Sequence, residues 1–414
     1  MAHLLLYRLL ITLFALHALS RALRRDGRDV LRARLGGGSA PPDDRPHIWL
    51  HGASNGELAS ARPVIEALRA RRPDLSLLVT CNSTTGVEMV GRWNLEGVTA
   101  RPAPVDLGWV TRRVIRRWNV VAHVALESEL WPHRLLNCPG PVILLGARMR
   151  PGTARLWHRF GRLGRRLLDH VTLASAQDPD SRDRLRALGL PERAEAPVMD
   201  LKSLYTPPDM APDSALAEAF SRDQTWLAAS THPGEEEIVI AAHRKLRGSE
   251  PQARLILAPR HPRRGAEVAE LVNATGLTLA RRSLGEAPGD AQVYLADTMG
   301  EMPLWYALAG RVFIGGTLND RGGHTPYEPA AFGAAILHGP DVANFRAPFT
   351  RLSKAGAASE IHDADSLTTA LHALESGEGQ RRAGKAAAEA LRQESDLDDL
   401  MARFIPLLPP VHET

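Results

Sequence analysis

Short apolar runs alternate with polar turns and amphipathic segments along most of this 414-residue chain. The runs that we predict as buried strands are residues 47–51, 75–80, 120–126, 141–145, 171–175, 226–229, 254–258, 293–295, 312–314 and 334–337. After the first of them, Leu58, Val64, Ile65 and Leu68 recur at helical spacing. Because strands that alternate with helices build parallel sheets, the pattern predicts an α/β fold.

Two segments interrupt this alternation of predicted strands and helices and divide the chain. Residues 36–44 (GGGSAPPDD) are rich in glycine and proline, and residues 205–212 (YTPPDMAP) also read as a linker. We therefore expect one domain at residues 45–204 and a second at residues 213–414, the latter ending in a charged helical segment.

The N-terminal segment, residues 1–35, is mostly apolar over its first twenty residues and then rich in arginine. A signal peptide carries its charge before the apolar region, which is the reverse of this order. The segment is only marginally long enough to span a bilayer, which takes about 20 apolar residues. We expect it to span or to lie in the interface, with the arginines and the globular body on the cytoplasmic side. The alternative is an amphipathic helix packed on the body.

The charged residues limit the classes of ligand that the chain is expected to bind. The chain has 51 Lys and Arg against 47 Asp and Glu, and arginine dominates the cations, which suits phosphate and carboxylate groups. Zinc-finger spacing and basic-aromatic RNA motifs are both missing from the sequence, which argues against nucleic acid. The sequence also lacks the glycine-rich loop that binds ATP phosphates and the nucleophile elbow of α/β-hydrolases.

In the first domain, candidate chemistry gathers where strands end. Ser54 or Asn55 can cap a helix that begins near Gly56, and Glu57 lies in its first turn. A carboxylate at a helix N-terminus is expected to be ionised and able to act as a general base. The alternative is a capping glutamate that only satisfies backbone donors.

Two further carboxylates, Glu127 and Glu129, follow the strand at 120–126, and Arg148 follows the next strand. The carboxylates fit acid/base chemistry or sugar-hydroxyl recognition, but they are equally typical of a solvated turn.

Four strand ends of the second domain carry polar residues of the kinds that hold a phosphate, a ribose and a base. These candidates are Ser230, Thr231, His232, Glu235, Arg260, His261, Met299, Gly300, Glu301, Gly315, Gly316, Gly323, His324 and Glu328. Arg260 is expected to bind phosphate and Glu328 to accept from ribose hydroxyls. The loop at Gly315 and Gly316 is expected to offer backbone N–H groups to an anion, unless its glycines serve only for turning.

A metal site is not expected. His51, His232, His261 and His324 lie on different turns, form no i, i+4 pair, and are joined by no cysteine.

The blocks IWLHGASNGE, ESELWP, STHPGEEE, PRHPRR, ADTMGEM and FIGGTLNDRGGHTPYEPAAFG resemble those of the Kdo transferases, in the same order. These enzymes transfer 3-deoxy-D-manno-octulosonic acid (Kdo) from CMP-Kdo to lipid A precursors. The resemblance covers about residues 45–345. It implies a GT-B architecture, with two Rossmann-like domains facing a cleft, the acceptor on the N-terminal domain and the nucleotide sugar on the C-terminal one. It further implies a metal-independent, inverting enzyme without a cofactor at the cytoplasmic face of the inner membrane.

By this resemblance Glu57 is the catalytic base, and the acceptor side includes Ser54, Asn55, Gly56, Glu127, Glu129 and Arg148. The same resemblance maps Arg260, Gly300, Glu301, Glu328 and Asn344 to CMP-Kdo contacts, and it implies that catalysis depends on closure of the two domains.

The sequence departs from the family pattern at several positions. Asn55 stands where the family usually has valine, Thr325 and Tyr327 replace an asparagine and a leucine, and only Lys202 remains of the G-N-x-K block. These changes leave open which acceptor is used and how many Kdo units are added. Two other functions remain open: another GT-B enzyme, either a UDP-sugar transferase or an epimerase, and a non-catalytic lipid A-binding relative.

Overall fold

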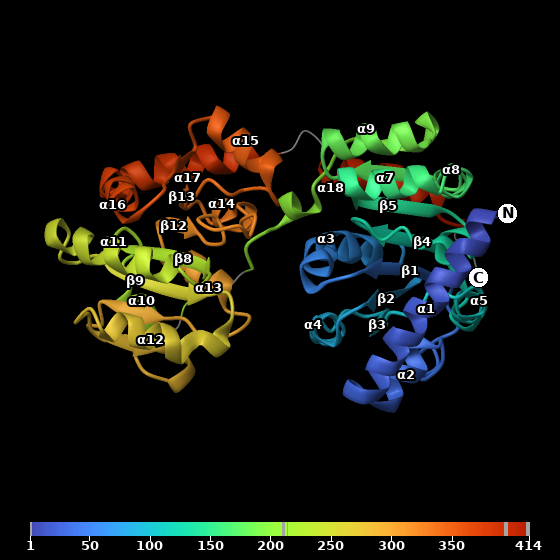
Figure 1. The fold of residues 1–414 in the computed structure, drawn as a ribbon, viewed down its shortest axis with the longest axis horizontal. Coiled ribbons are helices and arrows are strands. Elements are labelled where there is room, and N and C mark those ends of the chain that lie inside the picture. Colours follow the sequence, from blue (N-terminus) through green and yellow to red (C-terminus); the bar gives the residue numbers. More distant parts are fainter. Residues whose placement is uncertain (1, 209–211, 213, 393–395, 411–414) are drawn as a thin grey trace. The chain divides into compact units, whose positions relative to one another are not determined.

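The computed structural model describes residues 2–208, 212, 214–392 and 396–410 (Figure 1). The chain divides into two compact units, the first comprising Met1–Leu204 with Gln393–Thr414 and the second Tyr205–Arg392. The expected linker at 205–212 falls partly outside the described residues.

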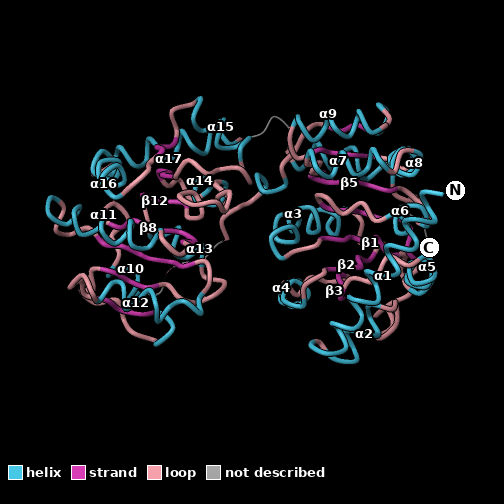
Figure 2. The backbone as a smooth tube through the Cα atoms, viewed as in Figure 1, coloured by secondary structure: helices cyan, strands magenta, loops and turns pink. Residues whose placement is uncertain are grey.

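The first unit is built on a seven-stranded sheet in which all neighbouring strands run parallel. The strands are magenta in Figure 2. In sheet order its strands are β3 (Val98–Pro102), β2 (Ser76–Cys81), β1 (His47–Gly52), β4 (Val120–Leu126), β5 (Val142–Ala147), β6 (Leu173–Ala176) and β7 (Glu195–Ala196). The chain runs outward from β1 to β3 and then returns to β4 on the other side of β1. The boundary between β1 and β4 is therefore the topological switch point of this sheet.

Helices cover both faces of the first sheet, because its central strands are buried on both sides. The helices of this unit are α1 (Ala2–Arg25), α2 (Gly27–Arg34), α3 (Asn55–Arg71), α4 (Thr84–Arg92), α5 (Gly108–Arg117), α6 (Pro132–Asn137), α7 (Pro151–Arg159), α8 (Arg162–Asp169), α9 (Pro179–Leu188) and α18 (Leu397–Phe404). Ile48 and Leu50 of β1 pack with α3 in one core cluster, while Trp49 joins Val114 of α5 in another.

The C-terminal helix α18 corrects the expected extent of the second domain. Leu400, Met401 and Phe404 are buried in the core cluster of the first unit that also holds Leu58 and Ile65 of α3. The second unit ends at Arg392, so the expected range 213–414 is too long, and the expected helical segment at its end comprises two helices, α17 (Gly377–Leu391) and α18. An apolar stripe shows that a helix packs on a core but does not identify which core.

The N-terminal helix α1 packs on the first unit through one face. Ile11, Ala15 and Ala22 are buried, and the Tyr7 hydroxyl donates to Asp106 Oδ2 at 2.6 Å. The Asp106 carboxylate also accepts the N–H groups of the second and third residues of α6, each at 2.9 Å. In the part of the chain that the structure describes, no helix is both long enough and apolar enough to cross a membrane.

The second unit repeats the same architecture with another seven-stranded parallel sheet. In sheet order its strands are β10 (Leu279–Arg281), β11 (Val293–Leu295), β9 (Arg254–Pro259), β8 (Thr225–Thr231), β12 (Arg311–Ile314), β13 (Ala335–His338) and β14 (Ala358–Glu360). Here the switch point lies between β8 and β12.

Alternate residues along strand β8 of the second sheet pack into two different core clusters. Leu227 and Ala229 of β8 pack in the cluster of α10, α13, α14, α15 and α17, whereas Trp226 and Ala228 pack in the cluster of α11, α12 and α16. These helices are α10 (Ser214–Ala219), α11 (Glu235–Ser249), α12 (Gly265–Asn273), α13 (Met302–Leu308), α14 (Tyr327–Ala331), α15 (Arg346–Lys354), α16 (Ala364–Ala373) and α17 (Gly377–Leu391). The predicted α/β fold is confirmed in both units.

Candidate functional site

The candidate residues of the first unit gather at its switch point. Glu57 follows β1, whereas Glu127 and Glu129 follow β4, the strand that pairs with β1 in parallel. Ligands of open parallel sheets bind at this place, outside the carboxyl ends of the strands. Sequence position alone does not bring these three carboxylates together, but the strand order does.

Glu57 is held in place by the start of α3. Ser54 is the N-cap, and its hydroxyl accepts the Glu57 N–H at 3.3 Å and donates to Glu57 Oε1 at 3.1 Å. Glu57 Oε2 accepts the backbone N–H of Ala53 at 2.7 Å. The carboxylate is therefore a capping group, as one of the two interpretations expected. Capping does not exclude chemistry, because each carboxylate oxygen has a second lone pair.

Burial raises the pKa of Glu57 to about 7, and the nearby charges of Glu127 and Glu129 act in the same direction against the hydrogen bonds from Ala53 and Ser54. The backbone donor at the helix start does favour the ionised form, as expected, but desolvation outweighs it and the net shift is upward. A carboxyl with a pKa near neutrality is well matched to general-base catalysis.

Glu129 has the opposite environment. His51 Nε2 lies 3.0 Å from Glu129 Oε2, and the Trp131 indole N–H donates to the same oxygen at 2.6 Å. Burial pushes the pKa of Glu129 upward, but these hydrogen bonds and the charge of Arg134 outweigh it and hold the pKa below its usual range. Two carboxyls whose pKa values are pushed apart can take different roles, so Glu129 stays ionised while Glu57 exchanges a proton.

Glu127 lies at the end of β4 with a φ of 46°, a left-handed conformation that a non-glycine residue rarely adopts. Its Oε1 pairs with Lys202 Nζ at 2.6 Å. Backbone strain of this kind collects at functional sites when the surrounding structure holds it in place.

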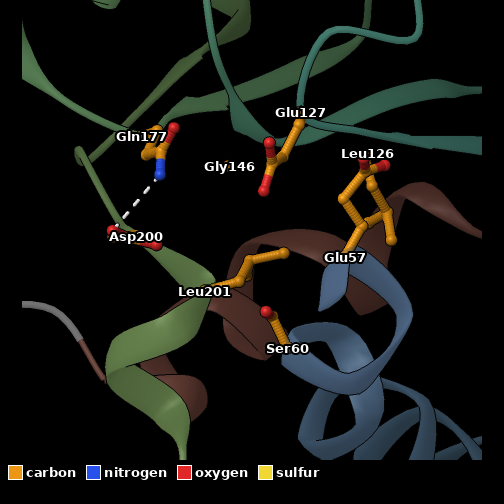
Figure 3. A pocket seen from close by; sticks show the side chains of 8 residues that line it. All are labelled: Glu57, Ser60, Leu126, Glu127, Gly146, Gln177, Asp200 and Leu201. Carbon is orange, nitrogen blue, oxygen red and sulfur yellow. Dashed lines mark hydrogen bonds between the residues drawn. The ribbon is translucent and has the colours of Figure 1, made fainter. Parts of the chain in front are cut away.

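A small cavity joins Glu57 and Glu127 to residues that the sequence did not indicate as site residues. Figure 3 shows the Glu127 carboxylate and the Ser60 hydroxyl directed into it, with Gln177 bonded to Asp200 on the far side. Gln177 Nε2 donates to Asp200 Oδ2 at 3.3 Å, and burial raises the pKa of Asp200. Asp200 and Lys202 lie in the segment that matches the family's G-N-x-K block only at Lys202. This partial match was the only signal in the sequence that the segment belongs to the site.

The remaining acceptor-side candidates surround the same place. Asn55 Oδ1 accepts the hydroxyls of Ser83 at 2.7 Å and Thr85 at 3.2 Å, which ties the start of α3 to the start of α4. Gly56 is exposed in the first turn of α3. The Arg148 N–H donates to the Glu127 carbonyl at 3.2 Å.

In the second unit, the four expected strand ends belong to four neighbouring strands, in the order β11, β9, β8 and β12. Because all four run parallel, their carboxyl ends share one edge of the sheet. The loops after β8 and β12 flank the switch point.

Glu235, the first residue of α11, binds backbone N–H groups of the glycine-containing loop after β12. Its buried carboxylate accepts four backbone N–H groups, those of His232 at 2.9 Å, Gly316 at 2.7 Å, and Thr317 and Leu318 at 3.0 Å each. The expectation that the N–H groups of this loop bind a ligand anion is therefore wrong for Gly316 and the two residues after it. The protein supplies its own anion, which joins the loops after β8 and β12.

The loop after β9 is joined to the same helix. Glu236, fully buried beside Glu235, pairs with Arg264 Nη1 at 2.6 Å. The Arg260 N–H donates to the Thr231 carbonyl at 2.9 Å. Ser230, which precedes Thr231, has a φ of 58°. The first turn of α11 thus positions three of the four strand-end loops.

Two histidine side chains meet inside this arrangement. His232 Nε2 and His324 Nε2 are 3.0 Å apart, and the two rings are inclined by only 6°. His261 approaches His232 edge to face, with ring centroids 6.1 Å apart. Gly316 has a φ of 69°, which favours glycine. A Cβ atom there would also come within 3.4 Å of both the His232 and His324 rings, so lack of space is a second reason for glycine at this position.

The other donor-side candidates are placed less directly. Glu301 pairs with Arg282 at 2.7 Å, and neighbouring Met299 is 72% exposed. Gly300, between them, has a φ of 87°. Burial raises the pKa of Glu328 to about 6.

Gly323 and Asn344 belong to the framework of the loop after β12. The Gly323 N–H donates to the Gly316 carbonyl at 2.7 Å, and Asn344 Nδ2 donates to the Arg321 carbonyl at 2.8 Å.

One group among the described residues has the geometry of metal ligands: Glu250, His372 and Glu375. Glu250 already pairs with the buried guanidinium of Arg311 at 3.0 Å. A cation so close disfavours a second one, and we interpret the group as ion pairs.

Comparisons with known proteins agree with these observations. A family model described as 3-deoxy-D-manno-octulosonic-acid transferase (kdotransferase) matches residues 29–204. The 3-deoxy-D-manno-octulosonic acid transferase of Haemophilus influenzae is 34% identical over 390 residues, covering 91% of this chain and 90% of that protein. The protein of the same name from Bordetella pertussis is 32% identical over 393 residues, covering 90% of each.

A solved UDP-GlcNAc 2-epimerase from Neisseria meningitidis, bound to UDP-GlcNAc, superimposes with a TM-score of 0.60 at 11% identity, covering 87% of this chain and 100% of that one. At this identity the likeness shows the fold alone, which is of the GT-B type.

Proposed function

Because the chain belongs to the 3-deoxy-D-manno-octulosonic acid (Kdo) transferase family, we propose that it moves Kdo from CMP-Kdo to a hydroxyl group of a lipid A precursor. The observation that carries the proposal is Glu57, a capped carboxyl with a pKa near 7 at the switch point of the first unit. Glu127 and Glu129 lie at the neighbouring strand end and suit the polar face of a sugar acceptor.

In the proposed reaction, Glu57 takes the proton of the acceptor hydroxyl as its oxygen attacks the anomeric carbon of Kdo. The bond from that carbon to the phosphate oxygen breaks, and its electron pair leaves with CMP. Attack opposite the leaving group inverts the anomeric configuration. Glu57 then gives its proton to solvent and returns to the ionised form.

The second unit is proposed to hold the donor. Arg260, with Arg264 nearby, supplies positive charge to the phosphate that departs. Glu235 does not touch the nucleotide in this proposal, because its oxygens are occupied by backbone donors, and it is assigned as a positioning residue.

Helix α1 supports a place at the cytoplasmic face of the inner membrane. Leu9, Leu10, Leu13, Phe14 and Leu16 are each close to half exposed or more, although they belong to a helix whose other face is buried. An apolar face flanked by arginines suits the interface of an anionic membrane. The acceptor, a lipid, is found at the same surface.

The decisive experiment incubates the purified chain with CMP-Kdo and a lipid A precursor and weighs the product. A mass increase of one or more Kdo residues is expected, and their number defines how many units are added. In parallel, CMP should raise the melting temperature more than UDP does. Stabilisation by UDP alone, without transfer, would favour a UDP-sugar enzyme.

The proposal also predicts a pH profile. Glu57 must be ionised to accept a proton, so kcat/KM for the acceptor, measured at saturating CMP-Kdo, should fall by about tenfold per pH unit below the pKa of Glu57 and level off above it. With a pKa of about 7, the bend should appear near neutrality. At saturating CMP-Kdo, a value of kcat/KM for the acceptor that is independent of pH between roughly 5.5 and 8 would contradict the assignment of Glu57 as the base.

A further inference from the structure

The histidine pair of the second unit shares a single hydrogen bond. With 3.0 Å between His232 Nε2 and His324 Nε2, one nitrogen must carry a proton and the other must offer a lone pair. A neutral pair satisfies this requirement, and so does a pair with one added proton. Two added protons would place N–H against N–H, so the pair can take up only one without moving apart.

The surroundings of the pair are cationic. Arg321, His261, Arg260 and Arg264 act on His232, and Arg260 and His261 also act on His324. Two carboxylates of the adjoining helix start are already engaged, Glu235 by four backbone N–H groups and Glu236 by Arg264. Burial, followed by these positive charges, lowers the pKa of each histidine to about 4, so both rings are neutral in the absence of a ligand at neutral pH.

Both rings remain partly exposed, so a ligand can reach them. An anion at this place would oppose these positive charges. An opposite charge within about 4–6 Å raises the pKa of a histidine by about 1–3 units. The diester phosphate of CMP-Kdo carries one negative charge, and the monoester phosphate of CMP carries more than one.

We propose that His232 and His324 form a proton-binding pair that takes up one proton when the phosphate of the cytidine nucleotide binds beside it. The inference rests on the proposed function, because the phosphate belongs to the donor or to the CMP product. The added proton gives the pair a further N–H donor for the phosphate while keeping the hydrogen bond between the rings.

The direction of the pH effect follows from linkage. Binding that takes up a proton strengthens as the pH falls, by at most about tenfold per pH unit for one proton. The effect is confined to pH values between the pKa of the pair without the ligand and its raised pKa in the complex. Release of the nucleotide returns the proton to solvent, so product release would be favoured at higher pH.

Isothermal titration calorimetry of CMP binding tests the inference with the full-length chain. Titrations at about pH 6.5 in two buffers of different ionisation enthalpy give the number of protons taken up per CMP. The comparison is with His232→Gln and His324→Gln, because glutamine keeps a hydrogen-bonding side chain but does not titrate. CMP itself titrates in this range, so the protonation of bound CMP in each protein is read from its phosphorus NMR shift and subtracted from the total. His362→Gln, which changes an exposed histidine outside the site, is the matched control.

The wild type and His362→Gln should take up a larger fraction of a proton than either pair variant. Equal uptake in all four proteins, with CMP bound, would overturn the inference and leave the proposed function intact. Failure of the wild type to bind CMP would overturn the proposed function, and the inference with it.

Should the pair variants bind CMP too weakly to titrate, nitrogen NMR of the wild type labelled in histidine decides the question. The pair variants then serve only to assign the signals in the absence of CMP. At saturating CMP the nitrogens of one imidazole ring should shift to the imidazolium range. Both rings remaining neutral would overturn the inference.

Discussion

Replacing Glu57 by glutamine should lower kcat for Kdo transfer by about 100- to 10,000-fold, the usual cost of losing a general base. The substitution keeps the local structure, because the glutamine oxygen can accept the Ala53 N–H and its amide can donate to the Ser54 hydroxyl, the two partners of the present carboxylate. Initial rates at saturating CMP-Kdo and acceptor measure the effect.

The matched control is Glu66→Gln, on the same helix. Glu66 is exposed and pairs with Arg62 one turn away at 2.7 Å, so its loss should change neither rate nor stability measurably. CMP binding should be unchanged in both variants. Near-wild-type transfer by Glu57→Gln, with the melting temperature intact, would exclude Glu57 as the base.

The second large effect is expected from Glu235→Gln. The carboxylate accepts two backbone N–H groups on each oxygen, whereas an amide presents N–H groups where one oxygen was. Each hydrogen bond to a charged group contributes about 1.5–3 kcal/mol, so losing two should destabilise the second unit by about 3 kcal/mol or more. For a unit of this size, 3 kcal/mol corresponds to a fall in melting temperature of about 6–12 °C.

Hydrogen exchange locates the effect of Glu235→Gln. The amides of Gly316, Thr317 and Leu318 should lose protection, and CMP affinity should fall because His232 and His324 lose their alignment. Glu237→Gln, an exposed position in the same helical turn, should leave protection unchanged. Unaltered exchange at residues 316–318 would show that Glu235 does not hold the loop.

The central strands of both sheets were predicted from sequence, and the outermost strands were not. The predicted apolar runs coincide with strands β1, β2, β4, β5, β6, β8, β9, β11, β12 and β13. The missed strands β3, β7, β10 and β14 are the edges of the two sheets. A strand buried on both faces must be apolar throughout, whereas an edge strand of two to five residues contacts little of the core and leaves little pattern.

The site shows a similar division. Local sequence placed Glu57 in the first turn of a helix and indicated the strand ends that carry Glu129, His232 and Glu235. It left base and cap as alternatives for Glu57, and for the loop after β12 it left binding of a ligand anion and simple turning as alternatives. The structure shows that Glu57 is a cap whose burial raises its pKa to about 7, and that Glu235 occupies that loop.

The sequence by itself determined the α/β rhythm, the restart of that rhythm in a second unit, and the residue types available at each strand end, because periodicity and turn chemistry are local properties. Only the tertiary structure decided that β1 pairs with β4 and β8 with β12, that α18 joins the first unit, and that His232 meets His324. Strand order, the choice of core and the pKa of a buried group depend on contacts between residues far apart in the chain, and those contacts exist only once the chain has folded.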